Sequence, residues 1–244
     1  MAVRESDVLT ANGDDGSAAG IGLLNEKPLH AALKEWLAQP GDAFEVVVDG
    51  YVIDIVSGAQ LIEVQTGPCS PLRDKLRALA GKHPTRLVIP VAREKWLLKL
   101  PKKPGGKARR RKSPKRGRVE ELFRELVSFP DLLRHENFSL EVLLIQEEEV
   151  RRHKPGRRWR RRGWVTEERR LLDVVERRLF HTPQDLLDLV HPGALPAEFT
   201  TADLAATMDA PRWLAQKAAF CLRNMGAIDP IGRRGNAYVY IVTR

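Results

Sequence analysis

Two short apolar runs separated by a tight turn constrain the fold of this chain more than any other feature. Val, Ile and Leu dominate residues 52–56 and 61–64, and Ser, Gly, Ala and Gln occupy positions 57–60 between them. This pattern predicts a hairpin of two buried β-strands. If Gly58 and Ala59 are the central residues of a type II′ turn, with Gly supplying the positive φ, cross-strand partners have numbers that sum to 117.

Three polar residues interrupt the apolar character of this hairpin: Asp54, Glu63 and Gln65. In the predicted register Asp54 faces Glu63 and Val52 faces Gln65, so the three polar groups emerge on one face of the sheet. Like charges opposite each other destabilise a sheet, and a cation with oxygen ligands, Mg²⁺ or Mn²⁺, would remove that cost. Asp54 and Glu63 are therefore the expected metal ligands. The alternative is a solvent-exposed sheet edge with two acids, but the flanking Val and Ile favour covered faces, where unpaired carboxylates are costly.

A helix is predicted immediately before the hairpin. Asn25 suits the N-cap, Pro28 lies in the first turn, and Pro40 and Gly41 end the helix. Glu26 then lies at the helix N-terminus, where the dipole favours its anionic form and where it would lean over the hairpin. An ordinary first-turn acid is the alternative interpretation of Glu26.

The order of these elements resembles the restriction-endonuclease-like, or PD-(D/E)XK, nuclease superfamily, which includes archaeal Holliday junction resolvases and Mrr-type restriction domains. The matching elements are the helix with Glu26, strand 44–49, the strand with Asp54, the strand with Glu63 and Gln65, helix 71–81 and strand 85–91. The resemblance covers residues 21–150. It implies an α/β fold with an αβββαβ core.

The resemblance also implies a reaction, the metal-dependent hydrolysis of phosphodiester bonds in duplex or branched DNA. Glu26, Asp54, Glu63 and Gln65 would be the catalytic residues, and the bound metal would lower the pKa of an attacking water. Gln65 stands where the superfamily has Lys, so Arg73 or Lys75 on the next helix would have to supply the positive charge. The departure keeps two alternatives open: a catalytically inactive nuclease-fold protein that binds DNA, and a subunit of a restriction or defence complex.

Positive charge is concentrated in two segments of a chain whose formal net charge is +9, which indicates a polyanionic partner. Residues 101–118 are rich in Lys, Arg, Pro and Gly and predict a mobile basic arm within the nuclease-like domain. Residues 151–165 predict a basic connector in which Arg alternates with Trp. The expected DNA-contacting residues are Arg109, Arg110, Arg111, Lys112, Arg157, Arg158, Trp159, Arg160, Arg161 and Arg162. A localisation signal and a surface hairpin with buried tryptophans are the respective alternatives.

Residues 166–244 predict a second domain. Thr166 suits the N-cap of an amphipathic helix through residue 179. From residue 199 onward a short helix, a turn, a helix begun by Pro211 and two strands resemble a winged helix-turn-helix domain. Its expected DNA-contacting residues are Arg212, Lys217, Arg223, Arg233 and Arg234. A winged helix used for protein contact is the alternative.

The remaining expectations concern the setting of the protein. Residues 1–20 predict a disordered tail without a secretory signal, and the apolar runs are too short to span a membrane, which favours a cytoplasmic, nucleoid-associated protein of a bacterial or archaeal cell. The chain has no phosphate-binding Gly loop, so no nucleotide cofactor is expected. Cleavage of both DNA strands would favour a homodimer. Phosphate contacts alone leave RNA open as a substrate.

Overall fold

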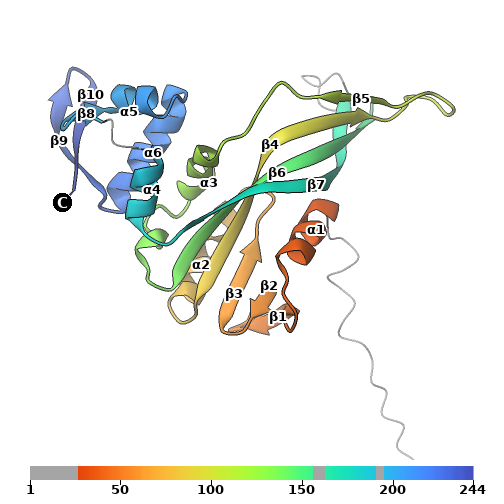
Figure 1. The fold of residues 1–244 in the computed structure, drawn as a ribbon, viewed down its shortest axis with the longest axis horizontal. Helices are drawn as coiled ribbons and strands as arrows, with labels where there is room; N and C mark the ends of the chain where they lie inside the picture. Colours follow the sequence, from red (N-terminus) through yellow and green to blue (C-terminus); the bar gives the residue numbers. More distant parts are fainter. Residues whose placement is uncertain (1–26, 156–162, 191–194, 244) are drawn as a thin grey trace, which may run out of the picture.

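The fold is mixed α/β, as the sequence predicts, and is built on one large twisted sheet (Figure 1). The computed structural model describes residues 27–155, 163–190 and 195–243. In that part of the chain, every helix lacks the length and apolar character needed to cross a membrane.

The large sheet has the strand order β1-β2-β3-β4-β6-β7, and β5 pairs with the far end of β4. β1, β2 and β3 are antiparallel neighbours, β4 runs parallel to both β3 and β6, and β7 is antiparallel to β6. The strands are β1 (Ala43–Val48), β2 (Tyr51–Ser57), β3 (Gln60–Val64), β4 (Thr85–Lys99), β5 (Arg109–Lys112), β6 (Phe138–His153) and β7 (Trp164–Phe180).

The predicted hairpin register is confirmed. Ile55 pairs with Ile62 and Val56 with Leu61, so partner numbers sum to 117. Gly58 has φ +57°, the left-handed conformation that a type II′ turn requires at its first central position and that Gly adopts at least cost. The hairpin therefore follows from local turn chemistry.

Helices cover both faces of the large sheet. α1 (Pro28–Leu37) packs the leucines of its apolar stripe against Ile55, Val64 and Val88 on one face. α2 (Arg73–Ala80) and α3 (Phe123–Leu126) pack Leu76 and Phe123 on the opposite face, in the main hydrophobic core. Because the centre of the sheet lies between these helices, Glu63 of β3 is buried and Asp54 of β2 is half-buried.

The C-terminal unit, residues 183–243, shares that main core. It contains α4 (Pro183–Val190), β8 (Phe199–Thr200), α5 (Thr201–Thr207), α6 (Arg212–Asn224), β9 (Ile228–Arg234) and β10 (Ala237–Val242), and its strands form a small sheet of order β8-β10-β9. The stripe predicted to face the core, Leu214, Ala218, Cys221 and Leu222, is buried against the residues around Phe123. The C-terminal unit is therefore packed firmly on α3.

Residues 166–179 are not the predicted helix. They belong to β7, which pairs with β6 along nearly its whole length, so the predicted domain boundary at residue 166 falls inside the large sheet. The charged residues explain the outcome, because Arg169 and Arg177 reach across to Glu147 and Glu141, both fully buried on β6. A helix would have left those two acids without these partners.

The basic segment 101–118 also differs from the predicted mobile arm. Its residues Arg109–Lys112 form β5, which pairs with β4 from Lys99 to Trp96. β4 is likewise longer than the predicted strand 85–91, because it continues beside β6 to Lys99. The far ends of β4, β5, β6 and β7 therefore extend the sheet beyond the helices that cover its centre (Figure 1).

Candidate active site

Asp54 and Glu63 are neighbours on the adjacent strands β2 and β3, as the register requires. The backbone N–H of Asp54 donates to the Glu63 carboxylate, and the backbone N–H of Val64 donates to Asp54 Oδ2 at 2.8 Å. The two acids are thus linked in both directions through the backbone of the hairpin. Two carboxylates are held close together in a largely buried position.

Asp54 is kept ionised by its surroundings. Burial alone would raise the pKa of Asp54, but hydrogen bonds from His30 and from the Val64 N–H outweigh burial and hold the pKa below its ordinary value. His30 Nε2 lies 3.2 Å from Asp54 Oδ2. His30 and Lys34, one turn apart on α1, both direct positive charge toward Asp54.

The surroundings of Glu63 have the opposite effect and favour its protonated form. The residue is only 4% exposed, and burial together with the negative charge of Asp54 raises the pKa of Glu63 to about 7. Lys75 of α2 opposes that rise, since its Nζ lies 2.6 Å from Glu63 Oε1 and 2.5 Å from the Val52 carbonyl oxygen that accepts its hydrogen bond. Glu63 therefore keeps its proton to a higher pH than an ordinary glutamate.

The two acids turn toward opposite faces of the sheet, where the sequence predicts a single face. Ile53 packs with Leu79 of α2, whereas Ile55, two residues later, packs with the leucines of α1. Residues two apart in a regular strand share a face, so the alternation of side chains along β2 is interrupted at Asp54. On β1, the position opposite Asp54 is Glu45, whose φ of +54° marks the same distortion. Asp54 consequently leans toward α1 and Glu63 toward α2.

Gln65 lies apart from this pair. Its side-chain amide donates to the Pro68 carbonyl oxygen at 2.6 Å, and within the described residues no hydrogen bond joins it to either acid. Of the two cations that the sequence offers in its place, Arg73 is bonded to the Ser128 carbonyl oxygen and Lys75 reaches Glu63. The positive charge beside the acids therefore comes from α2.

The donor set for a metal is small. In residues 27–155, 163–190 and 195–243 no group of three or more His, Cys, Asp or Glu side chains is arranged to hold a metal ion. Asp54 and Glu63 alone would supply carboxylate oxygens, and Glu63 Oε1 is buried without a properly angled hydrogen bond. The predicted catalytic residue Glu26 lies outside the described residues.

Arg109, Arg110, Arg111 and Lys112 are all exposed on β5. Arg110 is ion-paired with Glu148, and both Arg110 and Lys112 stack over the Trp96 ring. In the second basic cluster, the predicted residues Arg157, Arg158, Trp159, Arg160, Arg161 and Arg162 lie outside the described residues.

The C-terminal unit exposes most of its predicted contact residues. Arg212, Arg223, Arg233 and Arg234 are exposed, and Lys217 is half-buried. Three residues that the sequence argument missed, Gln216, Phe220 and Tyr238, join Arg212 and Arg223 in lining a small pocket between α6 and β10. Their helical spacing of about four residues from Arg212 to Phe220 would have revealed the shared face.

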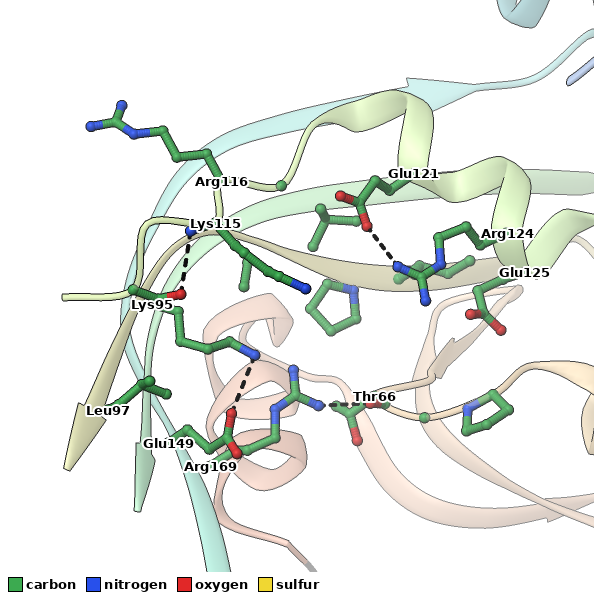
Figure 2. A pocket seen from close by; sticks show the side chains of 18 of the residues that line it. Thr66, Lys95, Leu97, Lys115, Arg116, Glu121, Arg124, Glu125, Glu149 and Arg169 are labelled. Carbon is green, nitrogen blue, oxygen red and sulfur yellow. Dashed lines mark hydrogen bonds and ion pairs between the residues drawn. The ribbon is translucent and has the colours of Figure 1, made fainter. Parts of the chain in front are cut away.

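One cavity was not predicted from the sequence. It has a volume of about 850 Å³, and Gln65 and the loop after β3 line one side of it (Figure 2). Asp54 and Glu63 are not among its lining residues. The cavity therefore begins where the strand carrying Glu63 ends.

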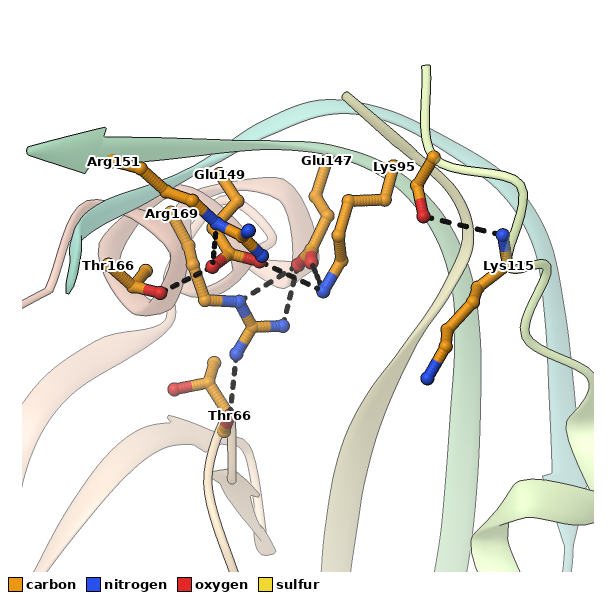
Figure 3. Close-up of polar contacts among 9 residues, drawn as sticks. Thr66, Lys95, Lys115, Glu147, Glu149, Arg151, Thr166 and Arg169 are labelled. Carbon is orange, nitrogen blue, oxygen red and sulfur yellow. Dashed lines mark hydrogen bonds and ion pairs between the residues drawn. The ribbon is translucent and has the colours of Figure 1, made fainter. Parts of the chain in front are cut away.

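A buried ionic network lies beside this cavity (Figure 3). Glu147 is fully buried and is contacted by Lys95 and Arg169, both at 2.6 Å. Arg169 also donates to the Thr66 carbonyl oxygen, which ties the network to the loop after β3. Glu149 is paired with Arg151, and hydrogen bonds from Arg151 and Thr166 outweigh burial and lower the pKa of Glu149 to about 2.

Comparisons with known proteins give a family and one relative. The family described as Domain of unknown function (DUF8091) matches residues 27–181. An uncharacterized protein of Treponema pallidum (strain Nichols) is 31% identical over 221 residues, which cover 90% of this chain and 86% of that protein. No solved structure matches the chain.

Proposed function

The chain belongs to the DUF8091 family, and we propose that it is a metal-dependent DNA endonuclease with a restriction-endonuclease-like core and a C-terminal winged helix. The observation that carries the proposal is the cluster of Asp54, Glu63 and Lys75. Two adjacent carboxylates and a lysine suit phosphodiester hydrolysis, which needs a cation site and positive charge near the scissile phosphate. The alternation of α1, β1 to β3, α2 and β4 agrees with the αβββαβ order of that core.

The electrostatics of the pair favour a divalent cation. With Glu63 buried, its charge is opposed by that of Asp54, and Lys75 only partly compensates. Mg²⁺ or Mn²⁺ would remove this repulsion if the Asp54 and Glu63 side chains, which lean toward α1 and α2 respectively, turned to share it, because hard cations take oxygen ligands. Such a cation would supply an activated water and stabilise charge on the phosphate.

The side chains around the acids have separate tasks in this proposal. His30 fixes the Asp54 carboxylate through the contact at 3.2 Å. Lys75 partly offsets the effect of burial on Glu63 and provides a cation for a phosphate oxygen, a task that Gln65 cannot perform because an amide carries no charge. Glu26, which lies outside the described residues, remains a proposed catalytic residue.

The proposed DNA contacts come from the ends of the molecule. Exposed arginines on β5, on α6 and on the β9-β10 hairpin suit phosphate contact, which positions a nucleic acid without reading its sequence. In the winged-helix proposal α6 is the recognition helix and Arg233 and Arg234 lie in the wing. A homodimer would bring two such sites to the two strands.

A second candidate is a nuclease-fold protein that binds DNA without cutting it. The observation that favours it is the pairing of each acid with a side chain of its own, His30 for Asp54 and Lys75 for Glu63. In that case no cleavage would occur with any metal.

A cleavage assay separates the two candidates. Linear, supercoiled, flap and four-way-junction DNA are incubated with the protein in Mg²⁺, Mn²⁺ or chelator. We expect metal-dependent cleavage that Asp54→Asn and Glu63→Gln abolish. Asp49→Asn is the matched control, because Asp49 is an exposed acid at the β1-β2 turn, paired with Lys82 and His83. Absence of cleavage with every DNA and metal would refute the endonuclease.

A further inference from the structure

The cavity of about 850 Å³ occupies a notch in the edge of β4. β3 pairs with β4 only as far as Val88, and β5 begins to pair at Trp96. Between these two points, no strand of the described residues completes that edge, and the loop after β5 is bonded to β4 at Ala92 and Lys95. The gap in strand pairing therefore leaves a cavity in the sheet edge, and the proposed site at Asp54 and Glu63 does not account for it.

The walls of the cavity carry an excess of positive charge. Seven of the lining residues are cationic and three are acidic; they are Lys95, Arg111, Lys115, Arg116, Arg124, Arg151 and Arg169, and Glu121, Glu125 and Glu149. Within the described residues neither Arg111 nor Lys115 has an acidic partner, and Figure 2 shows the Lys115 side chain reaching into the cavity. These two cations are available for an anionic ligand.

Arg116 and Arg124 are paired with Glu94 and Glu121, and the other three cations are held in place by the buried network. Lys95 and Arg169 are fixed by Glu147, and Arg151 by Glu149 (Figure 3). These ion pairs set the shape of the wall and leave the unpaired cations to attract the ligand. A preorganised wall lowers the cost of binding because few side chains must be ordered.

An aromatic ring from the C-terminal unit completes the cavity. Trp213 of α6 lines it, is 46% exposed, and lies under Arg124 at 5.8 Å. Arg124 is itself paired with Glu121, so the unpaired cations that share the cavity with this indole are Arg111 and Lys115. An exposed indole and unpaired cations in one cavity suit single-stranded nucleic acid, with bases on the ring and phosphates on the cations.

We propose that this cavity binds an unpaired strand of DNA, with phosphates on Arg111 and Lys115 and a base on Trp213. The volume is that of a small-ligand pocket, so it admits a few nucleotides of one strand and leaves a duplex at its rim. The proposal deepens the proposed function, because Gln65 connects the cavity to the strand of Glu63 and the substrate becomes DNA with an unpaired segment. It rests on the proposed function only for the cleavage of the bound DNA strand, and the binding itself does not depend on that function.

Binding is measured in chelator by fluorescence anisotropy, so that no cleavage is required. The probes are a short labelled single strand, a blunt duplex, a duplex with a single-stranded tail, and an RNA strand of the same sequence. We expect the single strand and the tailed duplex to bind more tightly than the blunt duplex. Lys115→Ala should weaken single-strand binding several-fold and reduce the slope of log K against log salt by about 0.7. Trp213→Leu should weaken it by about tenfold.

Lys82→Ala is the matched control, because Lys82 is an exposed lysine beside Asp49 and does not line the cavity. Circular dichroism verifies folding of each variant. Equal single-strand affinity of wild type, Lys115→Ala and Trp213→Leu, equal affinity for blunt duplex and single strand, or a preference for RNA would overturn the proposal. Metal-dependent cleavage lost in Asp54→Asn would then leave the proposed function intact. Conversely, the wild-type protein could cleave no DNA while the cavity variants still lose single-strand binding. That result would refute the proposed nuclease and support the proposed binding site.

Discussion

Lys75 Nζ lies 2.6 Å from Glu63 Oε1, although Lys75 belongs to α2 and Glu63 to β3. The same ammonium group is held by the Val52 carbonyl oxygen of β2, so the helix and two strands converge on one charge. Gln65, the first residue after that strand, is directed to Pro68 instead. The cation beside the acid pair thus comes from the helix, and its position can be tested separately from that of the acids.

Lys75→Gln should reduce metal-dependent cleavage by about a hundredfold or more, because it removes a fixed positive charge from the proposed phosphate site. The measurement is the single-turnover cleavage rate with saturating protein. Lys82→Gln, an exposed lysine close to the end of the same helix, is the control and should cleave at the wild-type rate. Wild-type cleavage by a folded Lys75→Gln protein would contradict the role given to this lysine.

Metal binding should be visible in thermal stability without any DNA. A cation that binds the folded protein raises the melting temperature by mass action, and Mg²⁺ or Mn²⁺ should do so for wild type but not for Asp54→Asn or Glu63→Gln. Asp49→Asn should keep the full shift. If the shift is equal in all four proteins, the metal binds elsewhere.

The same acid gives stability a definite dependence on pH in chelator. The pKa of Glu63 is about 7 in the folded protein against 4.5 as a free side chain, so the folded state holds the proton more tightly. The free energy of unfolding should therefore fall as pH rises from about 4.5 to about 7, by an amount on the order of 2 kcal/mol, and should lose no more from this group above that range. Urea titrations across pH measure the fall, which Glu63→Gln should diminish. An unchanged slope in that variant would contradict the assignment.

The hairpin was predictable because its determinants are local. Gly58 and the alternation of apolar residues around it fix a register that needs no information from distant parts of the chain. The buried stripe of α6 from Leu214 to Leu222 was predictable for the same reason, since helical periodicity is a local signal.

β7 was not predictable in this way. Leu171, Leu172 and Val175 have a spacing that suits a helix face, and the deciding interactions are remote in sequence. Arg177 bonds Glu141, 36 residues earlier, and Arg169 bonds Glu147, 22 residues earlier. The cavity escaped prediction for a related reason, because its notch depends on where two other strands stop along β4. Neither these long-range ion pairs nor the ends of the neighbouring strands can be read from a short segment of the sequence.

Arg169→Met should destabilise the protein by about 2 to 4 kcal/mol, because it leaves the fully buried Glu147 with Lys95 as its remaining cation. Arg170→Met is the paired control. Arg170 is half-exposed and bonds Glu168, so its loss should cost less than about 1 kcal/mol. Chemical denaturation of the two variants measures the difference, and equal costs would show that the buried network adds nothing to stability.

Gly117→Ala should both destabilise the protein and disturb the cavity. A Cβ atom at Gly117 would lie 2.6 Å from Val91 Cγ1 and 2.7 Å from the Ala92 carbonyl oxygen, and the Gly117 N–H donates to that same oxygen. Because the obstruction includes backbone, the loop carrying Lys115 has to move away from β4, at a cost of about 1 to 3 kcal/mol.

Gly232→Ala is the matched control for that substitution, since a Cβ there meets nothing within 4 Å. We expect Gly117→Ala to lower the melting temperature and to weaken single-strand binding in chelator, whereas Gly232→Ala should change neither. Because Gly117 presents no side chain to a ligand, weaker binding would have to come from the displaced loop. A Gly117→Ala protein with normal stability and normal affinity would mean that the close approach to β4 does not position Lys115.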